Sequence, residues 1–437
     1  MECRKYEIKF SIPAPVAGVI EKLRRAGFEA FIAGGAVRDM LLGGYEVKDF
    51  DVATSARPQD ILSLFPSAVF IDPSSSFPVV RLRVGEYEVD IATFRGEVAR
   101  GRHDVQWRFA DTMFEDASRR DFTINALYYD LTELIDCFGG LEDMAYRRIR
   151  FVGNPEARIR EDELRMLRAL RFAVRLGFNI DVTTLSAIRR SAELIREVPR
   201  ERIWEEIFRA TTTQRFSYFV GLLHRTYLLP YIMPHISMLH SIPPPPAGEH
   251  VNETDMLMHT LRVLARLDVL KAPPEVKLAG LYHDAGYIYT VHARGRRASH
   301  PGHEEASARI AEEELAALRA PRRVIRLVTF LVRHHMRLHH VYQSYASGAG
   351  RRSIVRAVAR FAFDVHMATR QFGMPPQQLA EYVAMLYIAD FGASEIAELF
   401  KRITSLPLPR INFDAILPSQ RVNALRSAFV QHALRSL

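Results

Sequence analysis

The sequence predicts an α+β fold, with a small mixed β-sheet in an N-terminal head and an all-helical remainder. Three short runs have the residue pattern of strands: 47–53, 78–84 and 86–94. A helical pattern at 15–27 precedes them, and helical patterns continue from about residue 155, broken at Pro243–Pro246 and at the SGAGRRS segment 347–353. These changes predict three domains: a head at 1–146, a helical neck at 147–240, and a helical body and tail at 241–437.

Length and composition are those of a folded protein with several domains. The chain has 437 residues, of which 48% are hydrophobic, enough for roughly two to four domains with buried cores. Its N-terminal segment MECRKYEIKF lacks the apolar core of a signal peptide, and no run approaches the roughly 18 apolar residues of a membrane helix. We therefore expect a cytoplasmic protein without a membrane partner. The only cysteines, Cys3 and Cys137, are too few and too isolated for a disulfide framework or a zinc site.

Arginine dominates the basic residues. The formal net charge is +8, and only 7 of the 59 basic residues are lysine, which leaves 52 arginines. The planar guanidinium suits phosphates and base edges, so this charge favours a polyanionic partner such as a nucleic acid. A biased genomic base composition would also produce the excess, so the charge gives modest support only.

Residues 33–54, AGGAVRDMLLGGYEVKDFDVAT, carry two carboxylates one residue apart in a strand-like run. Side chains alternate faces along a strand, so Asp49 and Asp51 point the same way while Phe50 and Val52 point into a core. Mg²⁺ takes one or two carboxylates and completes its coordination with water and phosphate oxygens. The pair therefore suits a nucleoside triphosphate held through a metal, although an isolated D-x-D run is more often a solvated strand end.

A paired glycine precedes these acids. Gly34 and Gly35 lack Cβ and let backbone N–H groups approach a triphosphate, and the helix that follows adds its positive end and Arg38. Asp90 lies in the 86–94 strand and would add a third carboxylate if that strand pairs beside the Asp49 strand. Three carboxylates can hold two metals, which lower the pKa of an attacking hydroxyl and stabilise a pyrophosphate leaving group. The alternative for Asp90 is a strand-face acid without a ligand role.

Segment 33–54 resembles motif A of the nucleotidyltransferase family that contains bacterial class II tRNA nucleotidyltransferases (CCA-adding enzymes) and bacterial poly(A) polymerases. RRDFTINALYYD, residues 119–130, resembles motif B, which in that family contacts sugar hydroxyls and phosphates. The resemblance implies catalytic metal ligands at Asp49, Asp51 and Asp90. It implies nucleotide contacts from four motif B residues: Arg119, Arg120, Asp121 and Asn125. Asp121 as a helix N-cap and Asn125 as a buried hydrogen-bonding residue are compatible structural roles.

RIREDELRMLRALRFAVRLGF, residues 158–178, predicts an amphipathic helix with arginines on its polar face. At 100° per residue, an arc of about 120° holds Arg165, Arg168, Arg171 and Arg175. Asp162 and Arg165, three residues apart, offer one acceptor and one donor. Cytosine and adenine each present an amino donor beside a ring-nitrogen acceptor, whereas uracil and guanine present a carbonyl beside an N–H. This pair would therefore accept C and A and reject U and G; the alternative is a solvated helix face.

The same helix resembles the family's motif D, with the E-D-x-x-R core at 161–165, which implies that Arg168 and Arg171 reach the triphosphate. The preceding RRIRFVGNPEARI, residues 147–159, resembles motif C. ERIWEEI, residues 201–207, resembles motif E, a neck helix with a chiefly structural role.

Histidines and acids form a second constellation in the C-terminal half: His259, His283, Asp284, His303, His334, His335 and Asp390. Such residues on helices suit one or two divalent metals of the Mn, Ni or Mg kind, although scattered core and surface histidines are the alternative. Their order resembles the HD phosphohydrolase domain of some CCA-adding enzymes, which implies a second metal site at His259, His283, Asp284 and Asp390. The family usually continues HD-x-G-K, and here Tyr287 follows Gly286. That departure leaves hydrolytic activity open.

The leading hypothesis is Mg²⁺-dependent, untemplated addition of C, C and A to tRNA 3′ ends from CTP and ATP, with the helical body and tail binding the tRNA. Alternatives are a partial enzyme that adds only A or only CC, a poly(A) polymerase and, more distantly, an HD-type nucleotide phosphohydrolase. Segment 96–118, with Gly101, Arg102 and His103, is long enough for the flexible loop that adenine addition needs in the family. KDFDVAT and NALYYD favour the polymerase, and ERIW with the HD-like body favours CCA addition. The oligomeric state stays open.

Overall fold

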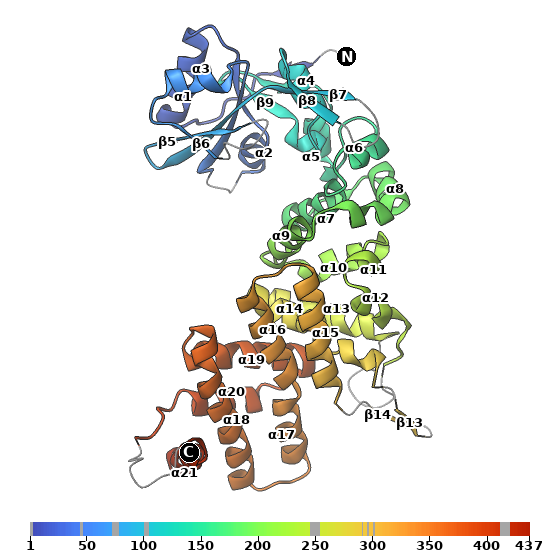
Figure 1. The fold of residues 1–437 in the computed structure, drawn as a ribbon, viewed down its shortest axis with the longest axis vertical. Helices are drawn as coiled ribbons and strands as arrows, with labels where there is room; N and C mark the ends of the chain where they lie inside the picture. Colours follow the sequence, from blue (N-terminus) through green and yellow to red (C-terminus); the bar gives the residue numbers. More distant parts are fainter. Residues whose placement is uncertain are drawn as a thin grey trace. The chain divides into compact units, whose positions relative to one another are not determined.

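The structure is a computed structural model and describes these residues: 3–43, 47–71, 78–99, 105–244, 254–290, 292–294, 297–299, 302–410 and 420–437. It divides the chain into two compact units, Met1–Glu197 and Val198–Leu437, coloured from blue to green and from green to red in Figure 1. The boundary lies inside the segment that the sequence assigns to the neck. Among the described residues, no helix combines the length and apolar character needed to cross a membrane.

A mixed eight-stranded sheet forms the framework of the first unit. Its strands, in spatial order, are β1 (Arg4–Tyr6), β10 (Leu134–Asp136), β9 (Leu127–Tyr129), β2 (Ala30–Ala33), β3 (Asp49–Thr54), β6 (Tyr87–Thr93), β5 (Val80–Val84) and β4 (Val69–Phe70). β3 and β6 run parallel, and the other neighbours in this sheet are antiparallel. The predicted α+β class is confirmed, and β3, β5 and β6 match the three predicted strands.

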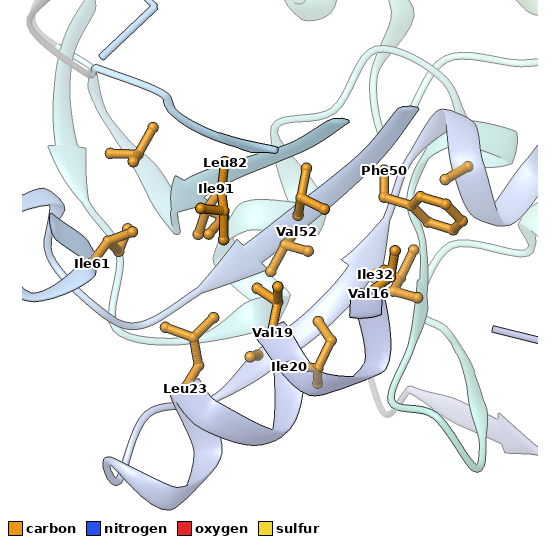
Figure 2. Close-up of a cluster of buried hydrophobic side chains, with 14 of the residues drawn as sticks. Val16, Val19, Ile20, Leu23, Ile32, Phe50, Val52, Ile61, Leu82 and Ile91 are labelled. Atoms are coloured by element: carbon orange, nitrogen blue, oxygen red, sulfur yellow. The ribbon is translucent and has the colours of Figure 1, made fainter. Parts of the chain in front are cut away.

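One face of this sheet packs against α1 (Ala14–Arg25) and α3 (Pro58–Leu64). Apolar side chains of α1 at helical spacing meet Phe50 and Val52 of β3, which are only 2% and 1% exposed (Figure 2). The prediction that these two residues enter a core is therefore confirmed. Because strand side chains alternate, the same packing turns Asp49 and Asp51 to the opposite face of the sheet.

Segment 96–118, predicted as one long loop, contains regular structure instead. β7 (Arg95–Ala99) pairs antiparallel with β8 (Val105–Phe109), and α4 (Met113–Ser118) follows. Gly101, Arg102 and His103 lie outside the described residues.

The predicted long neck helix is broken, which corrects the sequence expectation. α6 (Pro155–Glu161) ends at Asp162, whose extended backbone (φ −155°, ψ 102°) caps it, and α7 (Arg165–Leu176) begins three residues later. Asp162 Oδ1 accepts a hydrogen bond from the Leu164 N–H at 3.3 Å, a local bond that competes with the helical pattern. Asp162 and Arg165 are thus not neighbours on one helix.

Short elements complete the first unit: α2 (Gly35–Leu42), η1 (Thr123–Asn125), α5 (Gly140–Ala145), β11 (Arg148–Ile149), β12 (Asn179–Ile180), α8 (Val182–Ser191) and η2 (Ala192–Glu197). The second unit comprises α9 (Arg200–Thr211), α10 (Phe216–Arg225), α11 (Leu229–Ile232), α12 (Pro234–Met238), η3 (Leu239–Ser241), α13 (Met256–Val269), α14 (Pro274–Tyr282), η4 (Ala285–Ile288), β13 (His292–Arg294), β14 (Arg297–Ser299), α15 (His303–Ala317), α16 (Arg322–His334), α17 (Met336–Ala346), α18 (Arg351–Phe372), α19 (Pro376–Phe391), α20 (Glu395–Thr404) and α21 (Arg421–Ser436). The strand pairs β11–β12 and β13–β14 are additions to the predicted all-helical neck and body.

Cys3 and Cys137 form a disulfide, which the sequence did not predict. Their separation of 134 residues makes them look isolated, but Arg4 of β1 pairs with Asp136 of β10, and this register brings the cysteines together. The expectation was correct only in excluding a framework of several bonds.

Candidate functional site

Three predicted acids lie on the sheet face opposite α1. In the parallel β3–β6 register, Asp51 stands directly beside Asp90, and Asp49 stands beside Glu88. The strand that carries Asp90 thus pairs with the strand that carries Asp49, as a third carboxylate at this site requires. Glu88 is a fourth carboxylate on this face, and sequence reasoning missed it.

These carboxylates repel one another. Although Asp51 as a residue is exposed, protein atoms displace water from its carboxyl and raise its pKa, and the charges of Asp90 and Asp49 raise it further. The guanidinium groups of Arg120 and Arg38 oppose this rise. A hard divalent cation between the carboxylates would offset the repulsion, so the donor set fits Mg²⁺.

A cavity of about 410 Å³ opens over Asp51 and Asp90, whereas Asp49 and Glu88 are not among its lining residues. Its charged lining consists of Asp51, Asp90, Arg95, Asp116, Arg119, Arg120, Asp121, Asp162, Arg165 and Arg168. Side chains of motifs A, B and D therefore meet around one space. Five arginines and five acids there give it the mixed charge that a metal-bound polyphosphate would need.

Gly34 occupies a position that favours glycine. Its φ of 71° lies in the left-handed region, and a Cβ on it would stand 2.6 Å from Arg120 Nη1 and 3.6 Å from Asp51 Oδ2. Gly35 follows as the first residue of α2, so the start of that helix lies close to the acids.

Arg38 is buried and is not among the residues that line the cavity. It is 2% exposed, and it donates hydrogen bonds to Asp39 at 2.8 Å and to Asn125 Oδ1 at 2.6 Å. Asn125 in turn donates to Asp121 Oδ1 at 2.9 Å. Two of the four predicted motif B residues, Asn125 and Asp121, are thus connected to the helix that begins at Gly35.

Asp121 accepts hydrogen bonds from two motifs. Its Oδ2 accepts from Arg168 Nη2 at 2.6 Å, and its Oδ1 accepts from the Phe122 N–H at 2.8 Å. Burial alone would raise the pKa of this carboxyl, but the Arg168 charge and the hydrogen bonds outweigh it and lower the pKa. Asp121 therefore stays ionised and orients Arg168.

Asp116 is a buried acid that sequence reasoning missed. It accepts hydrogen bonds from Arg119 Nη2 at 2.7 Å, Arg120 Nη2 at 3.2 Å and the Tyr128 hydroxyl at 2.6 Å. Burial opposes ionisation, yet the two arginines hold the pKa of Asp116 well below its usual range. The available signal was its spacing of three and four residues before Arg119 and Arg120, the spacing at which charged side chains pair along a helix.

The motif D side chains divide between the cavity and the interior. Asp162, Arg165 and Arg168 line the cavity. Arg171 is 6% exposed, and its guanidinium stands 4.3 Å from the centre of the Phe172 ring, away from the cavity lining.

A second set of side chains meets inside the C-terminal unit. The Nε2 atoms of His259 and His283 lie 3.1 Å apart, and Asp390 Oδ1 lies 3.2 Å from His259 Nε2. Asp284 Oδ2 stands 3.3 Å from His283 Nε2. All four residues predicted for the second metal site are therefore brought together.

His303 and His335 extend this set. Their Nε2 atoms are 3.3 Å apart and face Asp284 Oδ1 at 3.4 and 3.5 Å, so the two oxygens of Asp284 serve two adjoining groups. His334, the third histidine of that region, instead packs against the rings of Phe330 and Phe361.

Backbone carbonyls fix the proton on two of these rings. His283 Nδ1–H donates to the Gly280 carbonyl at 2.8 Å, and His335 Nδ1–H donates to the Val332 carbonyl at 2.7 Å. In the neutral ring this leaves Nε2 as an electron-pair donor aimed into the cluster. Converging imidazole and carboxylate donors in this state fit a first-row divalent metal.

Sequence profiles of three known domains match the chain in order. They are the poly(A) polymerase head domain at 30–150, the probable RNA- and SrmB-binding site of polymerase A at 177–239, and the HD domain at 256–390. The chain belongs to the family of bacterial CCA-adding enzymes and poly(A) polymerases. Among solved members, the CCA-adding enzyme of Bacillus stearothermophilus in complex with CTP is 25% identical, with a TM-score of 0.67; the match covers 96% of this chain and 94% of that one.

Curated family members of both kinds match the chain. Poly(A) polymerase I of Escherichia coli O6:H1 is 41% identical over 204 residues, 43% of each chain. A CCA-adding enzyme of Geobacillus sp. is 40% identical over 216 residues, 49% of this chain and 53% of the relative. The chain thus matches about half the length of these family members.

Proposed function

We propose that the chain adds C, C and A to tRNA 3′ ends from CTP and ATP. The observation that carries the proposal is the meeting of the β3 and β6 carboxylates with the motif B and motif D side chains around one cavity. The likeness to a CTP-bound CCA-adding enzyme supports it.

Each part of the site has a task in this proposal. Asp49, Asp51 and Asp90 would hold Mg²⁺, which when bound activates the tRNA hydroxyl and stabilises the leaving pyrophosphate. Arg119 and Arg120, held by Asp116, bind phosphate oxygens. Gly34 leaves room for Arg120 beside Asp51. Because Asp121 holds Arg168, the nucleotide meets a guanidinium already in place.

The product distinguishes CCA addition from its alternatives. With tRNA ending at the discriminator base, we expect CTP alone to add C and then C, and ATP to add one A only to tRNA that ends in CC. The measurement is single-nucleotide product length on tRNA ending at the discriminator base, at C and at CC. Long runs of A on any of these ends would instead identify a poly(A) polymerase. Addition that stops after CC, or A addition alone, would identify a partial enzyme.

The histidine cluster supports a second activity, metal-dependent phosphoester hydrolysis. Two adjoining ligand groups joined by the Asp284 carboxylate would hold one divalent ion each. Such ions supply a hydroxide nucleophile and polarise a phosphoryl oxygen when bound. Tyr287, whose ring lies 4.7 Å from that of His303, stands where many HD domains carry lysine, so this site offers a neutral phenol there.

Metal content tests this second activity. We expect His335→Ala to lose the ion of the His303 group and to keep the ion of the His259 group, because the two groups have no residue in common. His334→Ala is the matched control, since its ring packs against phenylalanines outside the cluster. Elemental analysis and hydrolysis of p-nitrophenyl phosphate are the measurements. Equal metal content in both variants would contradict the two-ion assignment.

A further inference from the structure

Arg81 extends the row of catalytic acids on the sheet. It lies on β5 directly opposite Asp90 of β6, which in turn lies beside Asp51 of β3. Its Nε and Nη2 donate to the two oxygens of Asp90 at 2.7 and 2.9 Å. Two parallel N–H···O bonds are the strong, planar form of the arginine–carboxylate pair.

This pair matters because Asp90 is proposed to bind metal. Both Asp90 oxygens accept hydrogen bonds from Arg81, and a cation between Asp51 and Asp90 would need an electron pair of the same carboxylate. The guanidinium also places a fixed positive charge one strand away from any cation there. Both effects oppose metal binding at Asp90.

We propose that Arg81 is a positioning residue that holds Asp90 and weakens divalent-cation binding to the head until a nucleoside triphosphate is present. The triphosphate brings negative charge of its own, which offsets the repulsion between Arg81 and the cation. Metal and nucleotide then bind the head cooperatively, and the resting enzyme keeps Asp90 oriented. This inference rests on the proposed metal-assisted transfer.

Arg83 supplies a matched control. It lies two residues along the same strand, so its side chain is on the same face, but it pairs with Glu88 at 2.9 Å and makes no bond to Asp90. Arg83→Gln therefore removes the same charge from the same strand and leaves the Asp90 pair intact.

The experiment is a Mn²⁺ titration of the full-length protein, followed by the EPR signal of free Mn²⁺, without and with CTP. The histidine cluster can also bind Mn²⁺, so the part of the binding isotherm that belongs to the head is identified as the part that disappears in Asp51→Asn. We expect Arg81→Gln to tighten this component without CTP by about threefold to tenfold and to reduce the further tightening caused by CTP. Arg81→Lys keeps the positive charge but cannot form the two parallel hydrogen bonds. Its Mn²⁺ affinity should therefore lie between that of the wild type and that of Arg81→Gln. Thermal unfolding confirms that each variant is folded.

Each outcome has one meaning. If Arg81→Gln and Arg83→Gln have the same Mn²⁺ affinity as the wild type, Arg81 only joins two strands and the inference is overturned. If Arg81→Gln instead lowers the Mn²⁺ affinity of the head, then Arg81 supports metal binding, and the proposal that it opposes a cation at Asp90 is wrong. If the wild type has no component that Asp51→Asn removes, the proposed function fails at its metal, a result distinct from the first two.

Discussion

Asp51→Asn is expected to lower nucleotidyl transfer by about a thousandfold or more while the protein stays folded and keeps its RNA affinity. Asp51 stands beside Asp90 in the β3–β6 register and lines the cavity, whereas its strand neighbours Phe50 and Val52 form the core. The substitution therefore removes a proposed metal ligand and no packing. Asp49→Asn should have a similar effect, and Asp90→Asn should also be slower than the wild type.

Stability provides a second readout for this variant. The pKa of Asp51 is raised, so its charged form is less favourable in the folded protein than in the unfolded chain. That cost is absent at pH values below the unfolded pKa and is present in full above the raised pKa. At neutral pH Asp51→Asn should consequently unfold at the same temperature as the wild type or higher. Mg²⁺ should raise the unfolding temperature of the wild type more than that of the variant.

The control for lost charge is Glu86→Gln, an exposed acid in the turn between β5 and β6. Transfer rates are measured on tRNA ending in CC with ATP, at saturating Mg²⁺. Near-wild-type rates in both Asp51→Asn and Asp49→Asn would remove these residues from the metal site.

Local patterns in the sequence predicted the framework of the head because they report local physics. Alternation at 49–52 fixed which side chains face the core, and the burial of Phe50 and Val52 follows it. The glycine of the A-G-G-A run marked a backbone position that the structure shows to be left-handed at Gly34.

What the sequence could not predict depends on strand register and tertiary contacts. Arg81 is one of two arginines on a strand. Only pairing with β6 reveals that Arg81 meets Asp90, and also Glu88 at 3.3 Å, while Arg83 meets Glu88. The disulfide between Cys3 and Cys137 depends in the same way on β1 pairing with β10.

The helical periodicity of the neck segment led to a wrong prediction of one continuous helix. Apolar spacing continues through residues 158–178, so the pattern predicts one helix, but a hydrogen bond from the Leu164 N–H to Asp162 interrupts it. Arg38 looked like a phosphate ligand because it follows the paired glycine. Its burial against Asn125 could not be read from local spacing.

The break between α6 and α7 changes how Asp162 and Arg165 would select a base. Both line the cavity, Asp162 from the end of α6 and Arg165 from the start of α7. Arg165 donates to the Arg158 carbonyl at 2.9 Å, to the Arg119 carbonyl at 3.0 Å and to Glu161. Among the described residues these bonds use three of its five N–H groups, so Nε–H and one Nη2–H remain for a substrate.

These contacts make Arg165 a fixed donor rather than a mobile surface charge. Its guanidinium is anchored by two carbonyls and a carboxylate, so little entropy would be lost on binding a base. Arg165→Ala should therefore lower incorporation of CTP and ATP and also lower the unfolding temperature, because two part-buried carbonyls lose their partner. Arg165→Lys, which keeps the charge but not the fork, should retain stability better than selectivity.

Asp162→Asn is the sharper test, because it keeps size and replaces an obligatory acceptor with an amide that also donates. Cytosine and adenine need an acceptor for their amino group, whereas uracil and guanine offer a carbonyl that needs a donor. We expect discrimination against UTP to fall by about 10- to 100-fold, the worth of one hydrogen bond to a charged group. Glu163→Gln, the adjacent acid outside the cavity lining, is the matched control and should keep full C and A preference.

The measurement is single-nucleotide incorporation with each of the four triphosphates, on tRNA lacking CCA and on tRNA ending in CC. If Asp162→Asn and Arg165→Lys both keep wild-type selectivity, then hydrogen bonds from these two side chains do not choose the base, and their place at the cavity is structural.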